Sequence, residues 1–144
     1  MNARGALLAA LLLSAPALAE DTILKIRLAD VLSMPEGKGK LDGTVTFHLM
    51  GAKNAPSGEV LGQGISNKKT NAFGKSKAFA CQWAALSALR SLEAEAKKKG
   101  ATAVVDLVSY YRKSEVRSPV TIDCHVGGLM VGVALKGNYV SRTR

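Results

Sequence analysis

Residues 74–113, GKSKAFACQWAALSALRSLEAEAKKKGATAVVDLVSYYRK, decide the fold, because they predict one long helix, a stop at a glycine and a strand. Between Lys77 and Lys99, small and apolar residues recur at spacings of three and four, which places them on one helix face. These residues are Cys81, Ala84, Ala85, Ala88, Leu92 and Ala96. Ser76 is a favourable N-cap, and Gly100 suits a left-handed C-cap. The sequence therefore predicts a helix with one buried face and two marked ends.

Strand-like segments lie on both sides of this helix. They are residues 23–31, 44–49 and 60–65 before it, and residues 103–112, 119–126 and 129–136 after it. Short turns at 114–118 and 127–128 favour antiparallel neighbours. Gly137 and Asn138 are expected to end the last strand and to leave residues 139–144 as a basic tail. We therefore expect an α+β fold, with one long helix packed on one face of a mainly antiparallel sheet.

Residues 1–19 have the pattern of a secretory signal peptide. Arg4 precedes an apolar run at 6–13, and small residues at 17–19 predict cleavage before Glu20. The apolar run is shorter than the roughly 20 residues that cross a bilayer, so no transmembrane segment is expected. Residues 20–144 have the length of a single domain. The sequence therefore predicts a periplasmic or secreted protein.

The chain is basic, with a formal net charge of +9. Arg4 is the one basic residue of the predicted signal, and all 11 acidic residues follow it, so the remainder carries +8. Such a charge favours polyanions, which outside the cytoplasm include lipopolysaccharide, anionic phospholipids, acidic polymers and released nucleic acid. The alternative is a solvated surface whose charge serves solubility alone.

Cys81 and Cys124 predict a disulfide, because the expected compartment is oxidising and the cysteine count is even. The bridge would tie the helix to a strand. The alternative is a metal site that adds His48 and His125 to the two cysteines. Neighbours in a strand point to opposite faces, which separates Cys124 from His125, and no Cys-x-x-Cys spacing is present. We therefore expect neither a metal nor another cofactor.

Gly74-Lys75-Ser76, directly before the helix, is similar to the end of a phosphate-binding loop. The full motif requires a glycine where Lys69 stands, so ATP binding is not predicted. A looser anion-binding site at the helix N-terminus remains reasonable, since lysines would surround the unpaired helix amides. Its expected residues are Lys68, Lys69, Lys75, Ser76 and Lys77. The alternative is a plain N-cap with exposed lysines beside it.

Asp123 and His125 lie two apart on a predicted strand and should share a face. A carboxylate beside an imidazole can orient a general base, but a nucleophile is also needed. Ser109 and Ser114 are available, with nothing in the sequence to link them to the pair. Neither a Gly-x-Ser-x-Gly nor a His-Glu-x-x-His motif is present. A cross-strand salt bridge is the alternative, and no catalytic residue is predicted.

Aromatic and basic residues gather near the end of the strand predicted at 103–112. They are Tyr110, Tyr111, Arg112, Lys113 and Arg117. Such a mixture can stack on bases or sugars while it contacts phosphates. It can equally guard the edge of a sheet against unwanted pairing.

Several segments together resemble a family of small exported bacterial proteins that are often labelled as an excinuclease ATPase subunit. These segments are Lys69-Thr70-Asn71-Ala72-Phe73, Cys81, residues 99–105, Cys124 and Ala134-Leu135-Lys136-Gly137. More distantly, residues 76–136 are similar to the periplasmic domain of the Rcs stress-sensor lipoprotein and to YbjQ-like domains. These resemblances imply a helix-on-sheet domain with a helix-to-strand disulfide.

The ATPase label does not carry over, because the phosphate loop is incomplete and zinc-type cysteine pairs are absent. Signalling and membrane anchoring do not carry over either, because the sensor's additional cysteines and lipidation site are absent.

These observations predict a non-catalytic exported domain for binding or envelope sensing. Its expected partner is an anionic envelope component or another protein, and non-specific contact with nucleic acid is a further expectation. The alternatives are a small hydrolase that uses Asp123 and His125, and a metal-binding protein.

Overall fold

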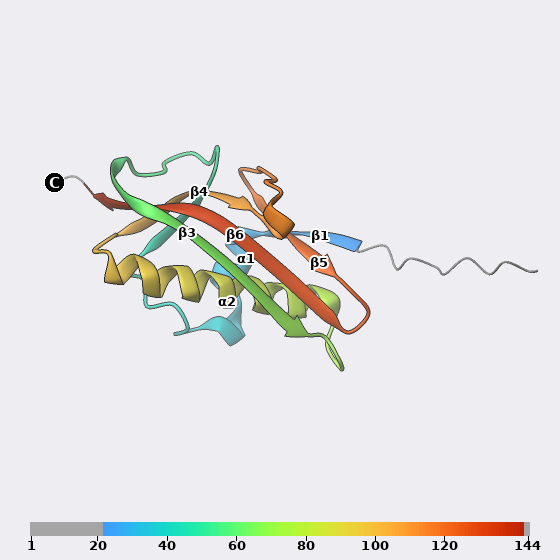
Figure 1. Cartoon of the computed structure of the whole chain (residues 1–144). Coiled ribbons are helices and arrows are strands. Elements are labelled where there is room, and N and C mark those ends of the chain that lie inside the picture. Colours follow the sequence, from blue (N-terminus) through green and yellow to red (C-terminus); the bar gives the residue numbers. More distant parts are fainter. Residues whose placement is uncertain (1–21, 143–144) are drawn as a thin grey trace, which may run out of the picture.

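The computed structural model describes residues 22–142, so the predicted signal peptide lies outside the described residues. In chain order the elements are β1 (Thr22–Arg27), α1 (Leu28–Ser33), the 3-10 turn η1 (Pro35–Gly37), β2 (Thr46–Leu49), β3 (Gly58–Asn71), α2 (Lys77–Lys98), β4 (Ala103–Ser109), the 3-10 turn η2 (Tyr111–Lys113), β5 (Thr121–Val126) and β6 (Met130–Arg142). One long helix lies against a curled sheet (Figure 1). The predicted α+β class is confirmed.

β6 is the central strand of the sheet. On one side it pairs with β3 along its whole length, and the two strands run side by side in Figure 1. On the other side it pairs with β5 near its start and with β4 near its end. β1 then extends the sheet from β5, and β2 extends it from β4. Every pair is antiparallel except β2 with β4, so the prediction of a mainly antiparallel sheet is confirmed.

α2 packs on one face of the sheet through small side chains. All six residues of the predicted stripe are buried: Cys81, Ala84, Ala85, Ala88, Leu92 and Ala96. Val131, Val133 and Leu135 of β6 belong to the same hydrophobic core. The face of the sheet that carries these three residues is therefore the helix face, and we call the opposite side the outer face.

The two ends of α2 are as the sequence predicts. The Phe79 amide donates to Ser76 Oγ at 3.1 Å, which satisfies one of the unpaired N–H groups of the first turn. Gly100 has φ +72°, a left-handed conformation that glycine adopts without steric cost. The helix ends at Lys98, one residue before the predicted end.

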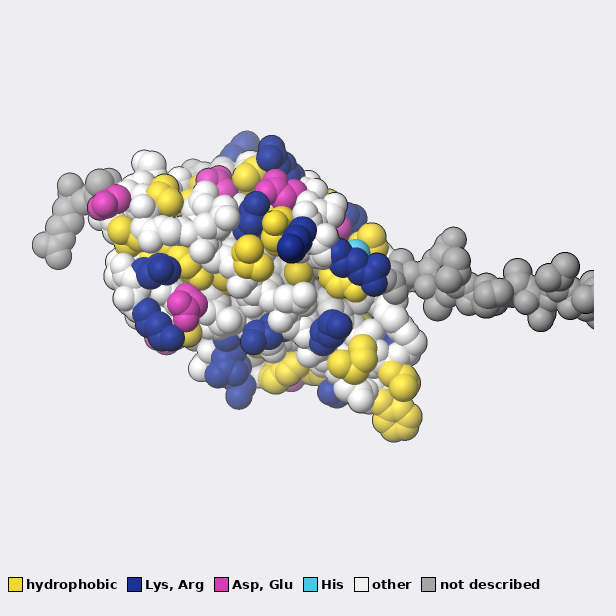
Figure 2. All heavy atoms as spheres, in the orientation of Figure 1, with side chains coloured by type: hydrophobic (Ala, Val, Ile, Leu, Met, Phe, Trp, Pro, Cys, Tyr) yellow, Lys and Arg dark blue, Asp and Glu magenta, His cyan; other side chains and the backbone are white. Residues whose placement is uncertain are grey.

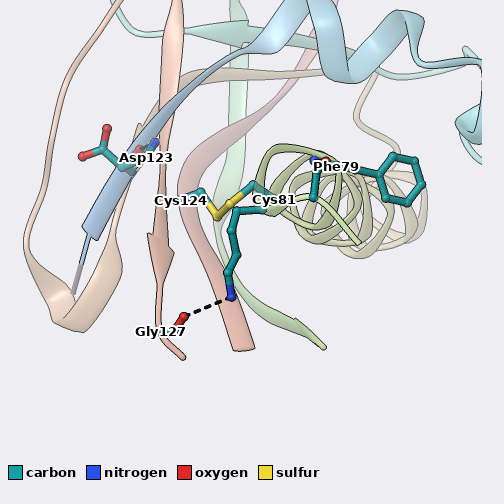
Figure 3. Close-up of a disulfide and its surroundings, with 8 residues drawn as sticks. Phe79, Cys81, Asp123, Cys124 and Gly127 are labelled. Carbon is teal, nitrogen blue, oxygen red and sulfur yellow. Dashed lines mark hydrogen bonds between the residues drawn. A yellow bond between two sulfur atoms is a disulfide. The ribbon is translucent and has the colours of Figure 1, made fainter. Parts of the chain in front are cut away.

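The disulfide between Cys81 and Cys124 joins α2 to β5, as predicted (Figure 3). The two Cα atoms are 5.8 Å apart, and both residues are fully buried. Asp123 and Cys124 point to opposite sides of β5 in Figure 3, with Cys124 toward the helix. The bridge therefore fixes the N-terminal half of α2 on the branch of the sheet that holds β5 and β1.

The predicted end of the last strand at Gly137 and Asn138 is wrong. β6 continues to Arg142 because β3 and β4 both pair with this second half. Tyr139, expected in a basic tail after the last strand, is 2% exposed and lies in the core. Tertiary pairing here overrides the turn preference of a Gly-Asn dipeptide.

Three other predicted segments differ in length. The strand expected at 23–31 stops at Arg27, and α1 follows because Leu28 and Val31, three residues apart, are both buried. The strand expected at 60–65 extends over the whole of β3, which is held by β6 despite its polar second half. The strand expected at 103–112 ends at Ser109, and Arg112 and Lys113 turn the chain with φ values of +52° and +64°.

Candidate functional site

The predicted anion-binding residues lie at the end of the molecule where β3 enters α2 and where β5 turns into β6. We call this end, residues 68–77 and 127–130, the basic tip. The Ala72 amide donates to the Leu129 carbonyl at 2.7 Å, and Asn71 pairs with Met130 in the β3–β6 register. Two segments that are fifty residues apart at their nearest ends therefore form one surface.

The loop from β3 to α2 has a defined conformation. The Phe73 amide donates to Asn71 Oδ1 at 2.7 Å, and the Lys75 amide donates to the Ala72 carbonyl at 3.1 Å. Gly74 between them has φ +70°, which favours glycine. These local bonds carry the chain from the strand directly to the Ser76 N-cap.

Lys77 connects the start of the helix to the other segment of the tip. Its ammonium donates to the carbonyls of Gly128 at 2.8 Å and Gly127 at 3.3 Å, and the second bond is drawn in Figure 3. Backbone carbonyls are neutral, so these bonds position the charge of Lys77 without cancelling it. The positive end of the α2 dipole adds to the same potential.

The four lysines of the predicted anion-binding site do not converge on a single position. Lys68 and Lys69 are consecutive in β3 and point to opposite faces of the sheet, with Lys69 on the outer face beside Gly132. Lys75 extends back toward the Asn71 carbonyl at 3.5 Å, and Lys77 lies across the Gly127-Gly128 turn. The lysines are thus spread over the tip, and neither segment of the tip contains Asp or Glu. Such a spread of charge suits an extended anionic surface better than a single phosphate held from several sides.

Sequence reasoning missed the apolar part of the same surface. Phe73, Leu129 and Met130 are all exposed, and their segments meet through the Ala72–Leu129 hydrogen bond. The one sequence signal for this apolar surface is Phe73, a large apolar residue within the turn Asn71–Lys75. Leu129 lies near Phe73 because of the β3–β6 register, and no local sequence pattern predicts that proximity.

Asp123 and His125 share the outer face of β5, as predicted, but each has its own partner. Asp123 is 3% exposed, and its carboxylate receives a bond from the Lys25 ammonium at 2.5 Å. The two residues are opposite each other in the β1–β5 register, so this is a cross-strand salt bridge. The Asp123 amide donates to Ser109 Oγ at 2.8 Å, which ties that serine hydroxyl to the backbone of β5.

The His125 ring stacks on Tyr111, with 3.6 Å between ring centroids and 15° between ring planes. The Arg112 guanidinium lies 5.2 Å from the centroid of the same tyrosine ring. The stacked pair separates two shallow hollows of the outer face. One, of about 150 Å³, includes Ser109, Ser114 and Asp123 in its lining. The other, of about 160 Å³, includes Lys69, Met130 and Gly132. The second hollow therefore adjoins the basic tip.

Tyr110 and Arg117 of the β4–β5 connection belong to a cluster that also includes Glu115 and Lys136 of β6. The Lys136 ammonium lies 4.6 Å from the Tyr110 ring centroid and also pairs with Glu115, which Arg117 contacts at 3.4 Å. Hydrogen bonds from Lys136 and then Arg117 lower the pKa of the Glu115 carboxyl. This cluster therefore neutralises part of its own charge, unlike the basic tip.

The metal hypothesis named Cys81, Cys124, His48 and His125, and these residues do not form a metal site in the described part of the chain. The disulfide uses both sulfur atoms of Cys81 and Cys124. His48 lies in β2 with Nε2 at 2.8 Å from Thr46 Oγ1, and burial lowers the pKa of its imidazole. Across residues 22–142, no three His, Cys, Asp or Glu side chains are grouped so that they could hold a metal ion.

Comparison with known proteins finds no family model that matches this chain and no curated protein that is significantly similar to it. The resemblance to small exported bacterial proteins therefore stays a prediction. In the described part of the chain, no helix is both long and apolar enough to cross a membrane.

Proposed function

We propose that this chain is an exported, non-catalytic binding domain that contacts an anionic component of the cell envelope through the basic tip. The observation that carries the proposal is the presence of four lysines at one end of the molecule, on two segments that contain no acidic residue. Phosphate groups of lipopolysaccharide or of anionic phospholipid supply the complementary charge. The disulfide supports export, because such bonds persist in oxidising compartments.

The opposite end of α2 provides a contrast that supports this location. Lys97 pairs there with Asp42 and lies 3.7 Å from Glu93, while Lys98 pairs with Glu95 at 3.1 Å. Acidic partners reduce the local potential at that end. The basic tip therefore presents the more concentrated positive charge of the two helix ends.

The hydrolase alternative draws less support from the same geometry. The Asp123 carboxylate takes part in a structural pair with Lys25, and the Ser109 hydroxyl accepts the Asp123 amide. A general base would instead use its carboxylate to orient the imidazole, and a nucleophile would need an accessible hydroxyl.

The proposal predicts that charge removal at the tip weakens binding more than equal charge removal elsewhere. Lys75→Ala with Lys77→Ala should lower affinity for lipopolysaccharide about tenfold at low salt, since local lysine charges supply most of the attraction. The control is Lys98→Ala with Lys99→Ala, about 30 Å away at the other end of the helix, which should lower it much less. Binding would be measured at two salt concentrations to lipopolysaccharide, anionic vesicles and single-stranded nucleic acid.

A second tip variant guards against a purely structural effect of Lys77, whose ammonium holds the Gly127-Gly128 turn. Lys68→Ala with Lys69→Ala leaves those bonds intact and should also weaken binding. Equal losses at the two ends of the helix would leave diffuse electrostatics and contradict a localised site. No binding at low salt would contradict the anionic partner altogether and favour a protein partner.

A further inference from the structure

Large apolar side chains are exposed on the basic tip, beside its lysines. Phe73 is 80% exposed, Leu129 is 64% exposed and Met130 is 43% exposed. Figure 2 shows hydrophobic atoms protruding at the lower right, where β3 ends and the loop to α2 begins, with Lys and Arg atoms on the side toward the body of the molecule. Clustered apolar residues on a protein surface, rimmed by polar ones, mark an interaction site.

The apolar residues are held outward by the backbone. Asn71 Oδ1 accepts the Phe73 amide, and Gly74 reverses the chain immediately afterwards, so the phenylalanine occupies the apex of the loop. Leu129 is fixed beside this loop by its carbonyl bond to the Ala72 amide. Met130 follows at the first position of β6. Both segments therefore present apolar side chains at the same end of the sheet.

The lysines beside these apolar residues have the chemistry of a membrane-surface anchor. A lysine side chain can lay its methylene stem along apolar material while its ammonium stays at the level of the phosphates. The exposed apolar residues can then enter the boundary between head groups and acyl chains. Basic residues near an anionic leaflet add electrostatic attraction that falls off within a Debye length. A dissolved polyanion offers no apolar phase to Phe73 and Leu129, whereas a bilayer offers an apolar phase directly beneath its phosphates.

We propose that the basic tip docks on the surface of an anionic lipid bilayer, with Phe73 and Leu129 entering the head-group region and the lysines contacting lipid phosphates. This inference rests on the proposed function and narrows its partner to a lipid surface. The contact is peripheral, because it uses two loop segments at one end of the folded domain.

The test separates apolar insertion from charge. The tip variant is Phe73→Ser with Leu129→Ser, and the matched control is Val60→Ser with Ile65→Ser, two β3 residues that are 61% and 59% exposed. Binding of the chain from Glu20 to Arg144 would be measured by co-sedimentation with vesicles of phosphatidylcholine alone and of phosphatidylcholine with phosphatidylglycerol. Single-stranded nucleic acid serves as a lipid-free polyanion. Circular dichroism melting would verify that both variants fold.

We expect the wild type and the control to bind the mixed vesicles, and the tip variant to bind them at least about tenfold more weakly, because two side chains lose their apolar environment. Binding to nucleic acid should be unchanged in both variants. A tip variant that binds mixed vesicles as tightly as wild type would overturn insertion and leave the anionic partner standing. Binding of wild type to nucleic acid or lipopolysaccharide, but not to mixed vesicles, would also overturn it. Failure of wild type to bind any of these would instead overturn the proposed function.

A spectroscopic readout reports insertion independently of affinity. The chain has one tryptophan, Trp83, so Phe73→Trp in a Trp83→Phe background places the sole indole at the tip. Its emission should shift to shorter wavelength with mixed vesicles and stay unchanged with nucleic acid. An unchanged emission with bound vesicles would contradict entry of residue 73 into the lipid.

Discussion

Replacement of Cys81 and Cys124 by alanine is expected to lower the free energy of unfolding by about 4 kcal/mol, because the bridge spans 43 residues of chain. A cross-link of that length removes many conformations from the unfolded chain, and its loss restores them. Both residues are fully buried, so lost packing adds to the effect. The bridge also holds the start of α2 against β5, close to the contact of Lys77 with the Gly127-Gly128 turn (Figure 3). Its loss should therefore loosen the basic tip as well.

Urea unfolding of the wild type and of the double alanine variant gives this difference directly. The single variant Cys81→Ala is the control, because it removes the cross-link while the Cys124 sulfur remains in the core. Most of the loss should already occur in the single variant. An unchanged urea midpoint in both variants would show that the disulfide contributes little to stability.

Tyr139→Ala is expected to lower the free energy of unfolding by about 3–5 kcal/mol, the range for truncation of a buried aromatic side chain. The Tyr139 ring is buried in the core and packs over Gly64, a residue of β3 that is diagonal to Tyr139 in the β3–β6 register. A Cβ atom placed on Gly64 would overlap the Tyr139 ring and would lie 2.9 Å from Leu92 Cδ2. Gly64 therefore leaves the space that the tyrosine ring fills, and Gly64→Ala should also destabilise the fold, by about 1–3 kcal/mol.

Thermal and urea unfolding of Tyr139→Ala would be compared with Tyr110→Ala, a control at a half-buried position, which should cost much less. Tyr139→Phe keeps the ring and isolates the hydroxyl. Burial, and then the charge of Glu95, raise the pKa of the Tyr139 phenol. The unfolded chain therefore ionises first as the pH rises above about 10, so wild type loses stability there and Tyr139→Phe lacks this contribution. Equal costs for Tyr139→Ala and Tyr110→Ala would contradict the core position of Tyr139.

Local sequence patterns predicted α2 well, because its periodicity and both of its caps lie within one segment. The disulfide followed from the expected compartment and the cysteine count. The second half of β6 could not be predicted in this way, since Gly137-Asn138 favours a turn when considered alone. Gly137 instead packs closely beneath Val104 and Leu107, a long-range contact that no local pattern contains.

The candidate site was predictable to a similar extent. The lysines were recognised because they are close in sequence, but strand alternation sends Lys68 and Lys69 to opposite faces. The exposed position of Phe73 beside Leu129 depends on the pairing of Asn71 with Met130. That register joins segments from different parts of the chain, so the apolar part of the tip emerged from the structure alone.

The most direct test of the central claim, that the basic tip is the binding end, is an amide chemical-shift map of the ¹⁵N-labelled chain during titration with lipopolysaccharide at low salt. We expect the largest changes at residues 68–77 and 127–130, with little change at residues 97–100 at the far end of α2. Changes of similar size at both ends of the helix, or an unperturbed tip in a complex that has formed, would contradict the claim.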